Sequence, residues 1–273
     1  MNIIEIKGSV AQQMFQYALY TAMRHTDPHT LINVAEPGDK WIKSRFSLQH
    51  YLQASAEQLK PYGMHSTAAR LMSRIIKPAG RIVTEPADAT FNPEVLNLND
   101  CYLRGQWLSP KYFASTEDEV REAFVVTDRQ LPARSIDLIK QLRKPQCVAM
   151  LVSEPQNGDV TADYFNWAVA SVMADLGQPQ FVVLTTDPEW VNANINFQGA
   201  KAQVTSYPTA NEATIIAYLM RASHCIISPS LNGWWGAWLN TDPDRIVIAP
   251  KNWSKTHPLP DLIPAHWTTI PLT

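Results

Sequence analysis

Residues Ser228–Lys251 read SPSLNGWWGAWLNTDPDRIVIAPK, with three tryptophans inside five positions. The apolar runs that end at Ile227 and that span Arg245–Ala249 are typical of buried strands. Between them, a loop of turn-forming and N-capping residues leads into Trp234–Leu239, which predicts a short helix. When a strand, a polar loop, a helix and a second strand follow one another, ligands bind at the carboxyl end of the first strand. The helix N-terminus at that point favours anions.

The polar residues of this loop are therefore candidates for contacting a phosphate. Ser230 and Asn232 lie next to the expected helix N-terminus, and Trp234 follows them. Two interpretations of the tryptophans are open, because they could line a ligand site or pack in the core. Gly236 has no side chain, so it allows another backbone to approach the helix closely.

Strand-like and helix-like runs alternate through the second half of the chain, which predicts a parallel, doubly wound sheet. The expected strands there are Gln146–Val152, Phe181–Leu184, His224–Ile227 and Arg245–Ala249, and the expected helices are Thr161–Leu176, Asn211–Arg221 and Trp234–Leu239. In the first half we expect strands at Asn2–Lys7, Leu31–Val34 and Cys101–Trp107, and helices at Met14–Arg24, Ala68–Lys77 and Arg134–Lys144. The dipeptide Lys144-Pro145 is the expected boundary between two lobes.

Composition argues against several classes of protein. The 273 residues carry a formal net charge of −2, which disfavours a nucleic-acid partner. Three cysteines, Cys101, Cys147 and Cys225, have no metal-ligand spacing and lie in or beside apolar runs. They are typical of reduced core residues in a cytosolic protein. Without a signal peptide or an apolar run of membrane-spanning length, we expect a cytoplasmic location.

Four collinear segments resemble a known family. The runs WWGAWLN, from Trp234, and IVIAPKNW, from Ile246, resemble the C-terminal signature of the family 11 glycosyltransferases, the α-1,2-fucosyltransferases. Residues 14–20 resemble the N-terminal signature of that family, residues 105–113 its central signature, and residues 184–190 a fourth. The matches extend from residue 8 to residue 253, so the resemblance covers nearly the whole chain.

The resemblance implies an α/β fold of the GT-B type, with two Rossmann-like lobes and a cleft between them. Residues 1–144 would form the acceptor-side lobe. Residues 145–273 would form the nucleotide-sugar-side lobe, with a proline-rich tail that packs back on the first lobe. The implied reaction is inverting transfer of a sugar from GDP-fucose, or from another nucleotide sugar, to a glycan hydroxyl in polysaccharide or O-antigen synthesis. No metal and no other cofactor is implied.

Three segments that would line the nucleotide site depart from the family pattern. The family loop Gly-Gly-Leu-Gly-Asn-Gln keeps only Gly8 and Gln13 here. The family run His-x-Arg-Arg-Gly-Asp aligns with residues 151–159, where Ser153 and Glu154 replace the arginine pair and Asp159 retains the final aspartate. In the third segment, Asn-Ser-Ser-Phe-Ser, one serine survives as Ser230.

Glycosyl transfer from a nucleotide sugar needs a base for the acceptor hydroxyl and positive charge for the leaving diphosphate. Asp159 is the best remaining candidate for the base. Asp187 either contacts the base or ribose of the nucleotide, or it caps a helix that begins at Pro188. The candidate substitutes for the missing arginine pair are Lys7, Arg104, Lys251 and Lys255, of which only Arg104 has a bidentate fork.

The residues and the resemblance together give a set of expected site residues. Catalysis is assigned to Asp159 and Arg104, although Arg104 could instead form a structural salt bridge. The nucleotide-sugar site is assigned to Gly8, Gln13, Ser153, Asp187, Ser230, Asn232 and Trp234. Three interpretations compete, and we favour the first: a working transferase with a rebuilt phosphate site, a catalytically impaired relative that acts as a binding or scaffolding partner, and an unrelated α/β enzyme.

The segment Ala68–Lys77 predicts an amphipathic helix with Arg70, Arg74 and Lys77 on one side. Such a helix either contacts the anionic inner face of a membrane that carries the acceptor, or is an ordinary surface helix. The surface helix is the interpretation we favour.

Overall fold

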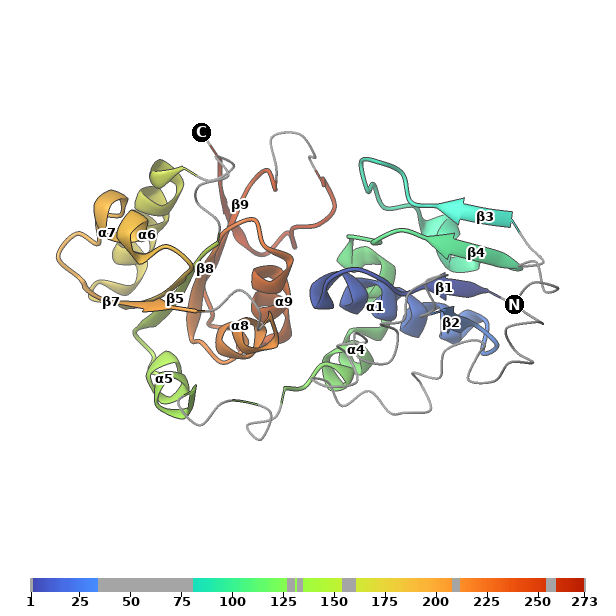
Figure 1. Ribbon diagram of the computed structural model, residues 1–273, viewed down its shortest axis with the longest axis horizontal. Helices are drawn as coiled ribbons and strands as arrows, with labels where there is room; N and C mark the ends of the chain where they lie inside the picture. The colour runs from blue at the N-terminus through green and yellow to red at the C-terminus, as the bar shows by residue number, and fades with distance from the viewer. Residues whose placement is uncertain are drawn as a thin grey trace. The chain divides into compact units, whose positions relative to one another are not determined.

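A computed structural model describes residues 2–33, 81–126, 131, 135–153, 161–207, 212–253 and 259–272. Contacts within the chain separate two compact units, of which unit 1 comprises Met1–Val126 with Pro260–Leu262 and unit 2 comprises Thr127–Leu259 with Ile263–Thr273 (Figure 1). Each unit is built on its own parallel sheet. The α/β, GT-B-like class expected from the sequence is confirmed at this level, and the cleft expected between the lobes stays a prediction.

Unit 1 holds a four-stranded sheet in the order β2-β1-β4-β3, and every neighbouring pair is parallel. Its strands are β1 (Ile3–Glu5), β2 (Leu31–Asn33), β3 (Arg81–Thr84) and β4 (Cys101–Arg104). Its helical elements are α1 (Val10–Thr26), the 3-10 helices η1 (Pro93–Asn97) and η2 (Pro110–Thr116), and α4 (Glu117–Ala123). The strand order reverses between β1 and β4, because the chain runs from β1 to β2 on one side and later places β4 on the other side.

Helix α1 begins at Val10 and not at Met14, where the sequence predicted its start. The reason is a capping box. Ser9 Oγ accepts the N–H of Gln12 at 3.4 Å, and Gln12 Oε1 accepts the N–H of Ser9 at 2.8 Å. The residues that were expected to form a loop therefore form the first turn of the helix.

Unit 2 holds a six-stranded parallel sheet in the order β10-β9-β8-β5-β6-β7. Its strands are β5 (Cys147–Val152), β6 (Gln180–Thr185), β7 (Lys201–Ser206), β8 (His224–Ile227), β9 (Val247–Pro250) and β10 (Thr268–Ile270). The four strands expected in this half are confirmed. The sequence did not predict β7 and β10, because β7 is a polar and largely exposed edge strand and β10 is very short.

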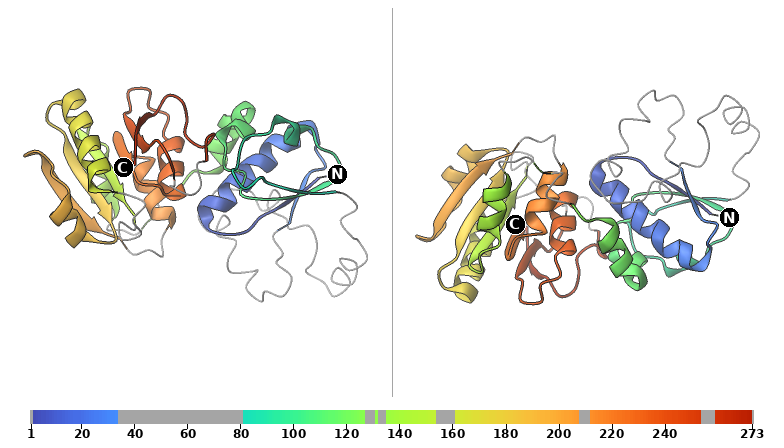
Figure 2. Two further views of the ribbon diagram at one scale, coloured as in Figure 1. Left: turned by 90° about the horizontal axis from the view of Figure 1, so that it is seen from above. Right: turned by 90° about the horizontal axis from the view of Figure 1, so that it is seen from below.

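The helices of unit 2 cover both faces of its sheet. They are α5 (Ser135–Leu142), α6 (Ala162–Leu176), α7 (Pro188–Asn194), α8 (Glu212–Leu219) and α9 (Leu231–Leu239). Helices α6 and α7 lie on one face, and α8 and α9 lie on the other (Figure 2). Side chains such as Val148 and Met150 pack under α6, whereas Leu151 and Ile227 meet α9 at Gly233. All six residues of β5 are buried, as expected for a central parallel strand.

Gly236 brings α9 and α8 together, which confirms the close approach predicted from the sequence. A Cβ at this position would lie 2.5 Å from the Cβ of Leu219 and 3.0 Å from the carbonyl oxygen of Ile216. No side chain fits at this distance, so the two helices can pack this closely only because residue 236 is glycine.

The expected lobe boundary, Lys144-Pro145, lies between α5 and β5. The division by contacts comes earlier in the chain, after Val126, because α5 packs against β5. In the C-terminal tail, Pro260–Leu262 group with unit 1, and β10 adds an edge strand to the sheet of unit 2. The assignment of an acceptor side and a nucleotide-sugar side stays a prediction.

Among the described residues, no helix is long and apolar enough to cross a membrane. The predicted helix with Arg70, Arg74 and Lys77 lies outside the described residues, as do Glu154, Asp159 and Lys255. The three cysteines are buried and free, as the sequence predicted.

Candidate functional site

The order of strands in unit 2 marks one point where a ligand is expected. From β5 the chain builds β6 and β7 on one side, then crosses to build β8, β9 and β10 on the other. In open parallel sheets, ligands bind beyond the carboxyl ends of the strands where this reversal occurs. Here that point lies between β5, which is followed by Ser153, and β8, which is followed by Ser228.

Ser153 and Ser228 are joined by a hydrogen bond. The N–H of Ser153 donates to Ser228 Oγ at 3.1 Å, and the N–H of Ser228 donates to the carbonyl of Leu151 at 3.1 Å. The hydroxyls of Ser153 and Tyr207 lie 3.2 Å apart, which adds the loop after β7 to the same group. Hydroxyl and amide groups therefore lie where β5 and β8 end, and the loss of the family's arginine pair at this point stays a prediction.

Helix α9 starts at this point, and it starts earlier than predicted. Ser230 is its N-cap and Leu231 its first residue, so Asn232 and Gly233 belong to the first turn and not to a loop. Ser230 Oγ accepts the N–H of Gly233 at 3.5 Å. Asn232 Oδ1 is buried and has no hydrogen-bond partner among the described residues. A buried acceptor without a donor costs about 1–3 kcal/mol, so this atom is suited to a donor supplied by a ligand.

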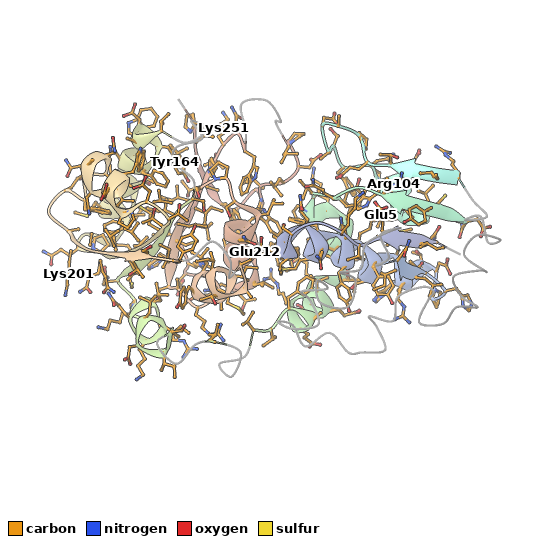
Figure 3. All side chains as sticks on the ribbon, viewed as in Figure 1. Glu5, Arg104, Tyr164, Lys201, Glu212 and Lys251 are labelled. Carbon is orange, nitrogen blue, oxygen red and sulfur yellow. The ribbon has the colours of Figure 1, made fainter. Side chains whose placement is uncertain are left out.

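Tyr164 of α6, labelled in Figure 3, bonds to the end of β8 from the face of the sheet opposite α9. Its hydroxyl donates to the carbonyl of Ile227 at 2.6 Å and lies 3.4 Å from that of Ile248. Burial raises the pKa of Tyr164 well above its usual value, so the hydroxyl remains a donor in ordinary buffers. Nothing in the pattern of the expected helix Thr161–Leu176 predicted this bond.

Trp234 is fully buried in an aromatic cluster. Its ring stacks on Trp238 with centroids 5.9 Å apart, and it meets Trp235 edge-on at 4.9 Å. Trp267, from the segment before β10, packs on the same ring at 5.9 Å. The core interpretation of the tryptophans accounts for these contacts, and a direct contact between Trp234 and a ligand stays a prediction.

Asp187 caps helix α7, as one of its two interpretations predicted. Its Oδ1 accepts the N–H of Trp190 at 2.9 Å, and its own N–H donates to Thr185 Oγ1 at 3.0 Å. The capping bond places the carboxylate at the carboxyl edge of the sheet, after β6. A contact between Asp187 and a nucleotide stays a prediction.

In unit 1, Gly8 and Gln13 lie at the start of α1. Gly8 has φ +91, and a Cβ there would lie 2.2 Å from Gln12 Oε1, so only glycine leaves room for the capping side chain. Gln13 Nε2 donates to the carbonyl of Gly8 at 2.8 Å, and Gln13 Oε1 is buried without a partner among the described residues. Gln12 therefore lies against the loop before α1 and caps the helix, and a contact of Gly8 or Gln13 with a nucleotide sugar stays a prediction.

Arg104 ends β4 beside Glu5, which ends β1, at the point where the strand order of unit 1 reverses (Figure 3). Arg104 Nε lies 3.4 Å from Glu5 Oε1, and Lys7 Nζ lies 2.8 Å from Glu5 Oε2. The salt bridge expected for Arg104 is present. Gln16 adds a link between the two strand ends, because it accepts the N–H of Lys7 at 2.8 Å and donates to the carbonyl of Gly105 at 2.9 Å.

Glu5 and Gln16 were not predicted as site residues from the sequence. The signal for Glu5 was a charge inside the apolar run NIIEIK. Nothing in the local pattern distinguishes Gln16 from the other glutamines of α1, because its two partners come from distant parts of the chain.

No group of three or more histidine, cysteine or acidic residues is placed to hold a metal in the part of the chain that the structure describes. The sequence contains one Asp-x-Asp pattern, Asp242-Pro243-Asp244. It lies in the turn before β9, at the amino edge of the sheet, where Asp242 Oδ1 accepts the N–H of Asp244 at 3.0 Å. This pair is remote from the strand ends where the ligand is expected.

Comparison with known protein families identifies the family to which the chain belongs. The model of the family described as Glycosyl transferase family 11 matches residues 92–270. The chain belongs to glycosyltransferase family 11. Membership excludes the interpretation as an unrelated α/β enzyme. The match includes the whole sheet of unit 2, but neither α1 nor the Gly8 and Gln13 positions.

Two curated proteins of Escherichia coli are similar to this family 11 chain. An alpha-1,2-colitosyltransferase is 25% identical over 177 residues, which are 61% of this chain and 61% of that protein. The O-antigen biosynthesis glycosyltransferase WbnK is 28% identical over 97 residues, which are 36% of this chain and 32% of that protein. The chain thus spans less than two thirds of either relative.

Two solved structures are also similar to this chain. Fucosyltransferase NodZ from Bradyrhizobium has a TM-score of 0.48 and 13% identity, with 86% of this chain and 90% of that chain covered. ADP-heptose lps heptosyltransferase II of E. coli has a TM-score of 0.47 and 15% identity, with 99% of this chain and 90% of that chain covered.

Proposed function

We propose that this family 11 chain is a glycosyltransferase that moves a sugar from a nucleoside diphosphate donor to a hydroxyl of a glycan acceptor. The family match across the sheet of unit 2 carries this proposal. The names of the two E. coli relatives favour a role in O-antigen or other cell-surface polysaccharide synthesis. GDP-fucose is the donor that the family resemblance favours, and a colitose donor is the one that the first relative suggests.

In the proposed reaction, the acceptor oxygen forms a bond to the anomeric carbon of the donor sugar. The bond from that carbon to the diphosphate breaks, and its electron pair leaves with the diphosphate. The acceptor hydroxyl loses its proton to a base, for which Asp159 is the candidate. Attack from the side opposite the leaving group inverts the anomeric centre. No metal is required in this scheme.

The donor would bind at the reversal point of the unit 2 sheet. The hydroxyls of Ser153 and Ser230 can donate to phosphate oxygens, and Asn232 Oδ1 can accept from a sugar or ribose hydroxyl. Trp234 would hold α9 in position, and Asp187 would lie beside the nucleoside. In unit 1, Gly8, Gln13 and Arg104 complete the set of residues assigned to this function. We also propose a cytoplasmic location, and Arg70, Arg74 and Lys77 are the residues that would contact an anionic membrane surface.

The decisive measurement is sugar transfer with a panel of nucleotide sugars, including GDP-fucose and a colitose donor, with and without EDTA. We expect turnover with one donor and no loss in EDTA. Asp159→Asn should lower kcat by at least about 100-fold while the donor still binds. Asp175→Asn, an exposed aspartate on α6, is the matched control and should leave kcat unchanged. Full turnover by Asp159→Asn would remove Asp159 from the scheme.

One observation favours a second function, that of a catalytically impaired binding or scaffolding partner. In the alignment that the family resemblance implies, Ser153 and Glu154 stand where the family has its arginine pair. Loss of one preorganised donor to a developing oxyanion costs about 2.7–4 kcal/mol. Under this alternative, the folded protein binds no nucleotide sugar but retains affinity for a glycan or for an active transferase.

A further inference from the structure

Positive charges in unit 2 are distributed unevenly between the two edges of its sheet. Because all six strands are parallel, every strand begins at the amino edge and ends at the carboxyl edge. Apart from Lys251, the described lysines and arginines of this unit lie at the amino edge, in the last turn of α5, just before a strand or at the first residue of a strand: Lys140, Arg143, Lys144, Lys201, Arg221 and Arg245. None of these residues can serve a ligand at the carboxyl edge.

Arg245 illustrates how these cations are used. It lies before β9 and donates to the carbonyls of Ala237 and Leu219, both at 2.8 Å. Those carbonyls belong to the ends of α9 and α8, where negative partial charge gathers. The guanidinium therefore supports the packing of two helices and is not available to a ligand.

Lys251 is the described cation of unit 2 that follows a strand. It comes directly after Pro250, the last residue of β9, and its N–H donates to the carbonyl of Ile270 at 2.8 Å. Its main chain is thereby held by β10, whereas its side chain is exposed and makes no hydrogen bond or ion pair with the described residues. Figure 3 labels Lys251, with Lys201 of β7 for comparison.

The strand register places Lys251 near the two serines. Ile226 of β8 pairs with Ile248 of β9, and Ile227 pairs with Leu151 of β5. When both registers are extended past the ends of the strands, Lys251 after β9 falls level with Pro229 after β8, and Pro229 falls level with Ser153 after β5. Neighbouring strands lie about 4.8 Å apart, so Lys251 is one strand from the β8 exit and two from the β5 exit. A flexible four-carbon stem can carry its ammonium toward both.

Carboxylates at the same edge of the sheet increase the need for a cation such as Lys251 beside a bound diphosphate. The helices that start at the same edge carry carboxylates in or next to their first turns: Asp163, Asp187, Glu189 and Glu212. These charges suit helix N-termini, but they repel a diphosphate. A diphosphate at this edge therefore depends on whatever cation can reach it.

We propose that Lys251 contacts the diphosphate of the donor and takes the place of the missing arginine pair. This inference rests on the proposed transferase function. As the bond between the anomeric carbon and the diphosphate oxygen breaks, the electron pair stays on that oxygen. The ammonium of Lys251 donates a hydrogen bond to the diphosphate and offsets its growing charge.

The test compares GDP binding by the wild-type chain, Lys251→Met, Lys251→Arg and Lys201→Met in isothermal titration. Lys201 is the matched control, because it is an exposed lysine at the opposite edge of the same sheet. Lys251→Met should weaken GDP binding about 10- to 100-fold, as expected for one charge-assisted hydrogen bond. Lys201→Met should bind within about twofold of wild type. Lys251→Arg should recover most of the affinity, and salt should weaken wild-type binding more than binding by Lys251→Met.

Each outcome has a separate meaning. If the wild type binds GDP and Lys251→Met binds it equally well, Lys251 is not the diphosphate cation, and the transferase proposal stands. If the folded wild type binds no nucleotide at all, the transferase proposal fails and the assignment of Lys251 fails with it. Circular dichroism of all four proteins separates loss of binding from loss of folding.

Discussion

The N–H of Ser153 donates to Oγ of Ser228 at 3.1 Å, and this bond joins the ends of β5 and β8. The two residues are far apart in the sequence, but their strands are neighbours in the sheet. Ser228 is fully buried, so its hydroxyl is dedicated to this bond. The bond fixes the spacing of the two loops at the point where the strand order reverses.

Ser228→Ala should therefore weaken both the fold and the site. Removal of the acceptor leaves the N–H of Ser153 unpaired, which should lower the free energy of unfolding by about 1–2 kcal/mol. Affinity for a nucleotide should fall as well, because the loop after β5 loses its anchor. Urea unfolding and titration calorimetry measure the two effects. Ser223→Ala, at the amino end of β8, is the control and should change neither.

Tyr164→Phe tests whether the end of β8 is held from the opposite face. The variant leaves the buried carbonyl of Ile227 without its donor, and we expect unfolding to become easier by about 1–2 kcal/mol. Tyr218→Phe is the matched control, because the hydroxyl of Tyr218 is bonded to Ser135 Oγ at 2.8 Å. Both variants should lose stability, and only Tyr164→Phe should lose nucleotide affinity. Equal affinity in the two variants would contradict the positioning role of Tyr164.

Gly236→Val should separate α8 from α9. Even a Cβ would lie 2.5 Å from the Cβ of Leu219, so the larger side chain forces the helices apart. Overpacking of this kind costs about 1–3 kcal/mol. Ala174→Val puts the same side chain at an exposed position of α6 and should cost well under 1 kcal/mol. Thermal unfolding measured for both variants checks the difference, and equal melting temperatures would refute this packing.

The carboxylate of Asp261 should make stability depend on pH. Burial alone would raise the pKa of Asp261, but its hydrogen bonds from Lys111 and from the N–H of Phe91, at 2.8 Å, outweigh burial and lower it. A lowered folded-state pKa stabilises the fold above the unfolded value of about 3.9, and this stabilisation disappears as the pH falls through the folded value.

Asp261→Asn should thus lower the free energy of unfolding by about 1–2 kcal/mol at pH 7. The difference from wild type should begin to shrink as the pH falls below the unfolded-state pKa of about 3.9, and it should shrink further as the pH falls through the lower folded-state pKa. Asp137→Asn is the control, because Asp137 and Lys140 form an exposed pair that contributes little. If the free energies of unfolding of Asp261→Asn and wild type differ by the same amount at pH 7 and at pH 3, the negative charge of Asp261 does not stabilise the fold.

Local patterns predicted much of unit 2 correctly. Strand β8 was predicted at the residues it occupies, and the N-cap role of Asp187 was one of two stated interpretations. Both depend on residues that are adjacent in the chain. The start of α1 was wrong by a turn, because the capping box of Ser9 and Gln12 outweighed the loop expected from the family pattern.

The candidate site was predicted only in part, because its geometry comes from residues that meet across the sheet. The sequence placed Ser153 and Ser230 on loops, but did not predict that Ser153 binds Ser228 or that Tyr164 supports β8. The sequence also did not distinguish whether the tryptophans pack in the core or line a ligand site. Burial of Trp234 against Trp267 required β10, a strand too short to predict.

Runs of apolar residues and short signatures along the chain were sufficient to specify alternating strands and helices, the parallel class of the sheets and the relationship to family 11. They were sufficient because strand, helix and turn preferences act between residues close in sequence. Only the tertiary structure decided which strands are neighbours, and so which loops share an edge. Lys201 begins β7, a strand that the sequence did not predict, so only the structure places Lys201 and Lys251 at opposite edges of one sheet. That difference arises from hydrogen bonds between distant strands, which no local pattern contains.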